Sequence, residues 1–213
     1  MPAYTTDDIR NVALVGHQSA GKTTLFEALL HAGGTIQTAG SVERGNTYSD
    51  FDPMEKSRGH SINATIASID HGGVHLNLID TPGFPDFRGP TLSALAAVET
   101  AAIVVSAPAG IEHSTVRMME YARARRLCRI LVVNKIDQEG ADLEMLVEQL
   151  RDAFGSECLP INLPAKQGNA VVDCFFSPSG EADFSSVAEA HQRIIDQVVE
   201  INEDVMGVYL EEG

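Results

Sequence analysis

The chain has 213 residues, 44% of them hydrophobic, and a formal net charge of −15. This size suits one α/β domain, or one domain with an insertion, and the absence of a long apolar run argues against a membrane span. The N-terminus lacks the basic and apolar regions of a secretory signal, and the three separated cysteines contain no C-x-x-C pair. We therefore expect a cytoplasmic protein with neither disulfides nor zinc. We also expect a monomer.

The negative charge is concentrated in the C-terminal part of the sequence. Residues 138–213 contain 3 basic and 16 acidic residues, whereas residues 1–137 contain 12 and 14. Such a segment would repel nucleic-acid phosphates, so we expect no sequence-specific DNA binding by it. A solvated acidic face and a surface for a basic protein partner are the two remaining interpretations.

Apolar runs and helical patterns alternate along the first two thirds of the chain. Residues 10–15 are predicted to form a buried strand, and the segment that starts at Lys22 is predicted to form a helix that ends at Gly33. Residues 33–60 are predicted as a long polar loop, and a loop of this length suggests function. The remaining predicted elements are a hairpin over 62–69 and 74–79, helices over 91–97 and 114–126, and strands over 101–106 and 129–133. This alternation predicts an α/β fold with a mostly parallel sheet.

After a predicted helix over 141–154, the sequence pattern changes. Prolines and glycines interrupt short apolar runs, and residues 184–210 then show apolar spacing typical of a helix. We therefore expect two parts, residues 1–154 as the main domain and residues 155–213 as a small subdomain or insertion.

A phosphate-binding loop is predicted directly after the first strand. The sequence Gly16-His17-Gln18-Ser19-Ala20-Gly21-Lys22-Thr23 matches G-x-x-x-x-G-K-[ST] and is followed by Thr24 at the start of a helix. The glycines let backbone N–H groups approach the phosphates, and Lys22 supplies positive charge. The Thr23 hydroxyl is a suitable ligand for Mg²⁺. The pattern therefore predicts a nucleotide phosphate site of the P-loop NTPase type in a three-layer fold.

A second motif, Asp80-Thr81-Pro82-Gly83, follows an apolar strand. The Asp80 carboxylate can hold a Mg²⁺-bound water, and the Gly83 N–H can contact a γ-phosphate. The alternative for this motif is a simple turn with a capping Asp.

A third motif, Asn134-Lys135-Ile136-Asp137, follows another apolar strand. The Asp137 carboxylate can accept two hydrogen bonds from the adjacent N–H groups of guanine, and the Lys135 stem can cover the base. Adenine offers no such pair of donors, so the site is predicted to reject ATP. A strand-ending turn is the alternative here as well. GTP or GDP with Mg²⁺ is the predicted ligand.

These motifs resemble those of the translational GTPases, most closely elongation factor G and its elongation-factor-G-like paralogues. Three further stretches resemble that family: Glu55-Lys56-Ser57-Arg58-Gly59, Asp86-Phe87 after the second motif, and the insert-like segments 159–164 and 171–173. The resemblance implies GTP hydrolysis on the ribosome, and it assigns Ser61 to the position of a threonine Mg²⁺ ligand. It also implies that the chain is the N-terminal portion of a longer protein and that its G domain is incomplete. A guanine-contacting Ser-Ala loop does not appear before Gly213, so we expect weakened nucleotide affinity. Ribosome-protection and release-type factors are weaker relatives.

Two positions depart from the family pattern and bear on function. Ser19 stands where the family usually has Asp, which leaves phosphate binding intact. Phe84 stands where the family has the histidine that orients the attacking water, and loss of such a group typically costs about 10²–10⁴-fold in rate. One alternative is therefore a GTP-gated ribosome-binding module with little hydrolysis. A second hypothesis is that His60 supplies an imidazole from the opposite side, against the simpler interpretation of an exposed loop histidine. In the family the insert helix faces a basic part of a ribosomal stalk protein, a role that the acidic region 189–212 could fill.

Overall fold

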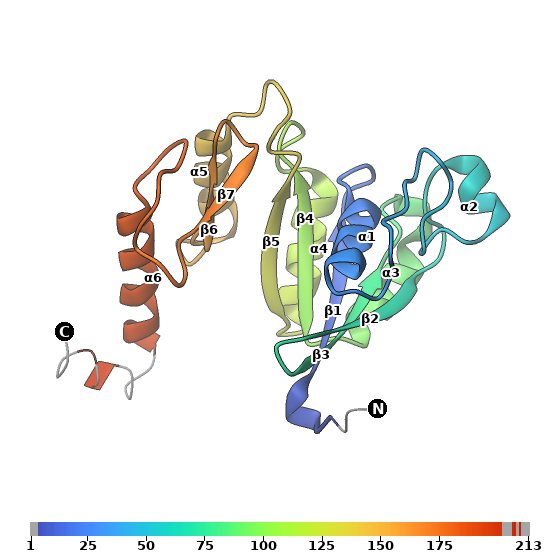
Figure 1. Cartoon of the computed structure of the whole chain (residues 1–213), viewed down its shortest axis with the longest axis horizontal. Coiled ribbons are helices and arrows are strands. Elements are labelled where there is room, and N and C mark those ends of the chain that lie inside the picture. Colours follow the sequence, from blue (N-terminus) through green and yellow to red (C-terminus); the bar gives the residue numbers. More distant parts are fainter. Residues whose placement is uncertain (1–3, 202–205, 208, 210–213) are drawn as a thin grey trace. The chain divides into compact units, whose positions relative to one another are not determined.

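The computed structural model describes residues 4–201, 206–207 and 209. The chain divides into two compact units, Met1–Lys135 and Ile136–Gly213 (Figure 1). This division by contacts falls earlier than the boundary at residue 154 that the sequence predicts. None of the helices within the described residues has the length and apolarity that a membrane crossing requires.

The first unit is built on a five-stranded sheet with the order β2-β3-β1-β4-β5. Its strands are β1 (Ile9–Gly16), β2 (Thr65–His71), β3 (Val74–Asp80), β4 (Thr100–Ser106) and β5 (Cys128–Asn134). The pairs β1–β3, β1–β4 and β4–β5 are parallel, and β2 joins β3 as an antiparallel hairpin. The predicted strands, the hairpin and the mostly parallel sheet are confirmed.

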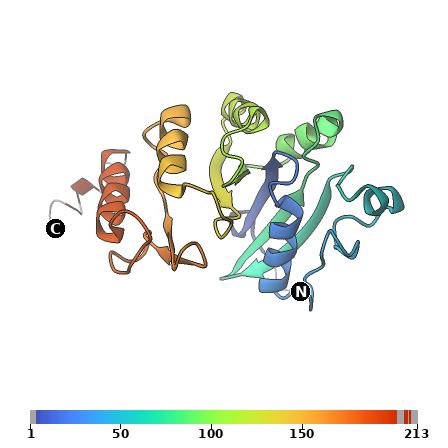
Figure 2. The same cartoon turned by 90° about the horizontal axis from the view of Figure 1, so that it is seen from above.

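Helices cover both faces of this sheet (Figure 2). Helix α1 (Lys22–Ala32) lies on one face, and α3 (Arg88–Ala96) and α4 (His113–Ala124) lie on the other. Two 3₁₀ turns, η1 (Thr6–Asp8) and η2 (Pro85–Phe87), precede β1 and α3. The arrangement is the predicted three-layer P-loop NTPase fold.

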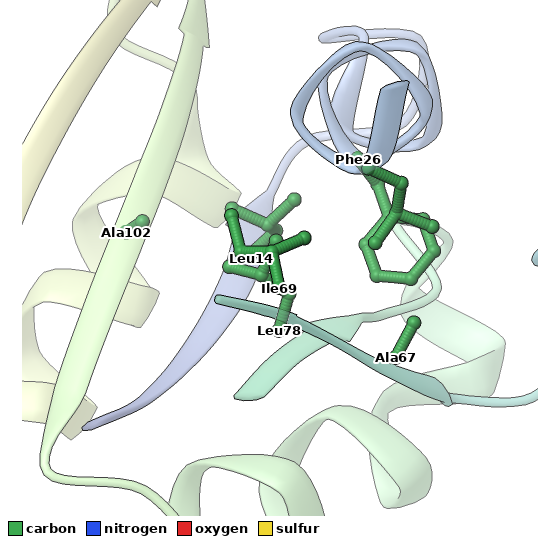
Figure 3. Packing of buried hydrophobic residues seen from close by; sticks show 7 residues of the cluster. Leu14, Phe26, Ala67, Ile69, Leu78 and Ala102 are labelled. Atoms are coloured by element: carbon green, nitrogen blue, oxygen red, sulfur yellow. The ribbon is translucent and has the colours of Figure 1, made fainter. Parts of the chain in front are cut away.

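The core beneath α1 fixes the helix on the sheet. Phe26 and Leu30 of α1 are fully buried and pack against strand residues that include Leu14 and Leu78 (Figure 3). Burial of a side chain of this size is worth about 1.5–3 kcal/mol. Because Lys22 begins the same helix, this packing also fixes the start of α1 at the edge of the sheet where β1 ends.

The segment between α1 and β2 contains one helix that the sequence analysis missed. Residues 33–60 are not a continuous loop, because Pro53–Arg58 form helix α2. Asp52 caps this helix through Met54 N at 2.7 Å, and Glu55 accepts a hydrogen bond from Asp52 N at 3.2 Å. Gly59 ends it with φ of 66°. The signal was present in the sequence as a capping box with Pro at the first helical position.

The second unit has its own small core. It contains α5 (Leu143–Phe154), a hairpin of β6 (Asn162–Ala165) and β7 (Ala170–Asp173), and α6 (Val187–Ile201). The buried residues of its core cluster are Leu163, Cys174, Val187, Ala190 and Ile194. The hairpin is formed largely by the two insert-like segments. The predicted final helix begins at Val187, and most of its expected part beyond Ile201 lies outside the described residues.

Candidate functional site

The candidate site of the first unit lies at the carboxyl edge of the parallel strands. Leu14 of β1 pairs with Asp80 at the end of β3, and Ser106 at the end of β4 pairs with Asn134 at the end of β5. Chain segments that leave parallel strands at one edge form the usual ligand-binding crevice of such sheets. The sheet therefore brings the ends of all three motif-bearing strands to one edge.

Close packing and positive φ angles explain both glycines of the phosphate-loop pattern. Gly16 has φ of 139°, and a Cβ atom there would overlap Val104 O. Gly21 has φ of 92°, and a Cβ atom there would overlap the Asn134 amide. Asn134 Nδ2 donates to Ala20 O at 2.9 Å, so the third motif holds the first directly. Only glycine combines this backbone conformation with so close an approach.

Lys22 is a buried cation at the start of α1. Its side chain is 6% exposed, and Nζ donates to His17 O at 2.7 Å and to Gly16 O at 3.1 Å. Burial lowers the pKa of Lys22 to about 8, and the nearby Asp80 carboxylate partly opposes this effect. A buried ammonium group whose hydrogen-bond acceptors among the described residues are two carbonyl oxygens favours an anionic ligand.

Gly83 of the second motif packs directly against the phosphate loop. A Cβ atom at Gly83 would lie 2.5 Å from Lys22 Nζ and 2.7 Å from the Gln18 backbone. Thr81 fixes the chain just before it, because its buried hydroxyl donates to Leu14 O at 2.7 Å. The second motif is therefore held against the phosphate loop and Lys22.

The three predicted metal residues lie together. Thr23 Oγ1 donates to Asp80 Oδ2 at 2.7 Å and lies 3.3 Å from Ser61 Oγ. Ser61 Oγ in turn donates to Asp50 Oδ1 at 2.7 Å. Asp50 is 4% exposed and is a site residue that the sequence analysis missed. No motif distinguishes it from Asp52 in the same loop, so the sequence carried no usable signal for it.

Asp80 is the most buried acid of this cluster. It is 1% exposed, and its Oδ1 atom has no hydrogen-bond partner among the described residues. Burial raises the pKa of Asp80 to about 6, against the lowering effects of the Thr23 hydroxyl and of Lys22. A cation would relieve the cost of this buried, unpartnered oxygen. Hydroxyl and carboxylate oxygens are the donors that a hard cation such as Mg²⁺ prefers.

A cluster of three or more His, Cys, Asp or Glu side chains suited to a metal is not found in the part of the chain that the structure describes.

His60 and Phe84 are also brought together. Their ring centroids are 4.2 Å apart, and the His60 ring lies 5.8 Å from that of Phe87. His60 Nδ1 lies 3.4 Å from Ser61 O. The interpretation of His60 as an exposed loop residue is wrong, because it is half-buried and packs against aromatic rings.

The remaining predicted residues lie outside the contacts around Lys22 and Thr23 that are described above. His17 pairs with Glu112, Ser19 and Lys135 have positive φ angles of 59° and 61°, and Thr24 is exposed on α1. Asp137 belongs to the second unit. There, a Cβ atom at Gly168 would overlap Ile136 O, so the β6–β7 turn packs against the backbone of the third motif.

Comparison with known proteins places this site in a family. Residues 7–207 match the family model described as the elongation factor Tu GTP binding domain. The chain is 32% identical over 207 residues to an elongation factor G-like protein of Mycobacterium tuberculosis, covering 92% of this chain and 29% of that protein. It is 34% identical over 179 residues to peptide chain release factor 3 of Symbiobacterium thermophilum, covering 82% of this chain and 34% of that protein.

A solved structure agrees with these matches. A crystal structure of a protein from Thermus thermophilus superimposes with a TM-score of 0.84 at 36% identity, covering 95% of this chain and 33% of that one. The chain thus spans about a third of the length of the relatives that it matches. The chain belongs to the translational GTPases that carry the elongation factor Tu GTP-binding domain, a family whose members hydrolyse GTP.

Proposed function

We propose that this chain is the GTP-binding domain of an elongation-factor-G-like translation factor, which hydrolyses GTP on the ribosome. One observation carries the proposal: the hydrogen bonds Asn134–Ala20 and Thr23–Asp80 join the segments that follow the three motif-bearing strands at one edge of the sheet. We assign residues 1–154 to the GTP-binding domain and residues 155–213 to an insert-like subdomain.

The phosphates would be held by the loop after β1. Its backbone N–H groups and the N-terminus of α1 favour anions, and Lys22 would exchange its carbonyl partners for phosphate oxygens. Gly83 would contact the γ-phosphate, because its backbone lies against Gln18 and Lys22. The loop residues assigned to this role are Gly16, His17, Gln18, Ser19, Ala20, Gly21, Lys22, Thr23 and Thr24.

Mg²⁺ fits the oxygen cluster around Thr23. The hydroxyls of Thr23 and Ser61 would be its direct protein ligands, and Asp80 would hold it through water. When bound, the ion neutralises charge that develops on the phosphate oxygens. Asp80 is suited to its role because its Oδ1 atom is buried without a partner among the described residues.

Guanine selection is assigned to the third motif. Asp137 would accept two hydrogen bonds from the base, and Lys135 would cover its plane. Asn134 acts as a positioning residue, since its amide holds Ala20 of the phosphate loop.

A second candidate function is a GTP-gated ribosome-binding module that hydrolyses GTP slowly. Phe84 favours it, because a phenyl ring cannot orient or polarise an attacking water. The His60 imidazole lies against the Phe84 ring. We retain the hypothesis that His60 takes over part of the missing role.

The ribosome is the proposed partner, and a basic segment of a ribosomal stalk protein is proposed for the acidic region 189–212. Within the described residues, α6 carries Glu189, Asp196 and Glu200 against one basic residue, Arg193. If charge drives this contact, its affinity will fall as salt rises from about 50 to about 300 mM. A salt-independent affinity would contradict the electrostatic version.

The proposed function is tested by GTP turnover of the protein that carries this domain, with and without ribosomes. Ribosome-stimulated hydrolysis that GDP inhibits and ATP does not would support the leading proposal. GTP-dependent ribosome binding without turnover would favour the second candidate. Equal competition by ATP would contradict both.

A further inference from the structure

We propose that Glu27 of α1 is a positioning residue that couples the nucleotide site to the loop between α1 and β2, residues 33–64. The inference rests on the proposed function, since it assigns to this loop the task of presenting Ser61 to the metal. Glu27 belongs to none of the motifs described above.

Glu27 lies one helical turn after Thr23, so the two side chains share a face of α1. Glu27 is 2% exposed. Among the described residues the ion pairs are His17–Glu112 and His75–Asp70, so Glu27 takes part in none of them. The buried Glu27 carboxylate is therefore satisfied by backbone N–H groups rather than by a lysine or arginine. A carboxylate in such a place stabilises the structure only while those donors stay in position.

The donors come from the two ends of one compact segment. Glu27 Oε2 accepts from Gly40 N at 2.7 Å, and Oε1 accepts from Tyr48 N. The chain between them closes on itself, because Ser41 N donates to Asn46 Oδ1 at 2.9 Å. A Cβ atom at Gly40 would lie 2.5 Å from Asn46 O, so this end of the segment requires glycine. Glu27 thus bridges the base of the segment 40–48.

This bridge leads directly back to the nucleotide site. Asp50 N donates to Thr47 Oγ1 at 3.2 Å, which fixes the turn that follows the bridged segment. Asp50 then accepts from Ser61 Oγ at 2.7 Å, and Ser61 lies 3.3 Å from Thr23. The path starts and ends on the same face of α1, so it forms a closed ring of contacts. Loss of the Glu27 bridge would release the segment that holds Ser61 beside Thr23.

A separate anchor acts on the other side of Ser61. Glu55 is 1% exposed and accepts from Ile62 N at 2.9 Å and from Asn63 N at 3.0 Å. Glu55 belongs to the loop itself, so its hydrogen bonds order the loop locally and do not connect it to α1. Glu27 differs because it connects the loop to the helix that binds the nucleotide.

The test compares the wild-type chain with Glu27→Gln and with the control Glu43→Gln, an exposed glutamate of the same segment. The Gln amide keeps one acceptor and turns an NH₂ group toward a backbone donor. With Mg²⁺ present, Glu27→Gln is expected to weaken binding of a non-hydrolysable GTP analogue about 10-fold and GDP less than about 2-fold, a selective loss of a charge-assisted contact. Trypsin should also cleave faster after Arg44 in this variant.

Unchanged analogue affinity and unchanged cleavage in Glu27→Gln would overturn the inference. Equal losses for both nucleotides would also overturn it, because they would indicate a merely structural role. Hydrogen exchange of the wild-type chain gives a readout that needs no variant: the Gly40 and Tyr48 amides should be protected at least about 10-fold relative to the Glu43 amide. Exchange of all three at equal rates would overturn the inference. A wild-type chain that binds no nucleotide contradicts the proposed function instead, and the exchange measurement still decides the Glu27 anchor.

Discussion

The His60 imidazole packs against the Phe84 ring, with centroids 4.2 Å apart and planes inclined by 40°. Phe84 is the position at which the family resemblance expects a histidine. The chain therefore places an imidazole beside that position, from the loop that carries Ser61 rather than from the loop that follows β3. Whether this imidazole takes part in hydrolysis can be measured.

We predict that His60→Ala lowers the single-turnover rate of ribosome-stimulated GTP hydrolysis by about 10-fold or more, the scale of a positioned acid–base group. Nucleotide affinity should change less, because the contacts of His60 within the described residues are with the Phe84 and Phe87 rings and the Ser61 carbonyl oxygen, none of which is assigned to nucleotide binding. His31→Ala is the matched control, since His31 is exposed at the end of α1. An unchanged rate in His60→Ala would eliminate the hypothesis.

Guanine selection should depend on Asp137. We predict that Asp137→Asn weakens GTP binding by about 10²–10⁴-fold, because the variant turns an amide donor toward the N–H groups of the base. The same amide complements the additional oxygen of xanthine, so binding should recover with xanthosine nucleotides. Competition titrations with GTP, XTP and ATP measure this. Retention of GTP selectivity by Asp137→Asn would contradict the assignment of Asp137 to guanine recognition.

Gly83 tests the contact between the second motif and the phosphate loop. In Gly83→Ala the new methyl group would lie 2.5 Å from Lys22 Nζ and 2.7 Å from Gln18 Cα. We predict that Gly83→Ala lowers the affinity for a GTP analogue by at least about 10-fold more than the affinity for GDP, since the close backbone approach requires glycine there. Gly89→Ala, where a Cβ atom meets nothing within 4 Å, should leave both affinities unchanged.

Lys22 should bind nucleotide at a cost to the stability of the nucleotide-free chain. Its folded-state pKa of about 8 lies below the ordinary 10.5, so between these pH values the unfolded chain binds the additional proton. The free energy of unfolding of the wild type should therefore rise by about 1–3 kcal/mol relative to Lys22→Met as the pH increases from about 8 to about 10.5. Denaturant titrations at the two pH values measure the difference. Lys56→Met, at an exposed position, should show no such trend.

Much of the fold followed from local sequence signals. The helix from Lys22 to Ala32 was predicted because the phosphate loop precedes it and Gly33 ends it. The strand before the second motif follows from the alternation of apolar and polar residues over 74–79, and the strand before the third motif follows from the apolar, β-branched run over 129–133. These signals depend on neighbouring residues, and a single sequence contains them in full.

The contacts around Ser61 could not be predicted, because their partners are far apart in the sequence. Asp50 meets Ser61 across eleven positions, and Glu27 meets Tyr48 across twenty-one. Both are ordinary acids in the sequence, and only the folded loop decides which carboxylate is buried. Helix α2 was predictable from Asp52-Pro53-Met54-Glu55 but was obscured by the polar composition around it.

The central claim is that this chain retains guanine nucleotide binding but has a changed hydrolytic position at Phe84. The most direct test is single-turnover GTP hydrolysis on ribosomes by the protein that carries this domain, compared with its Phe84→His variant. We predict equal GTP affinity and a rate at least about 10²-fold higher in the variant, the usual effect of restoring a group that positions the attacking water. A wild-type rate equal to that of Phe84→His would contradict the claim.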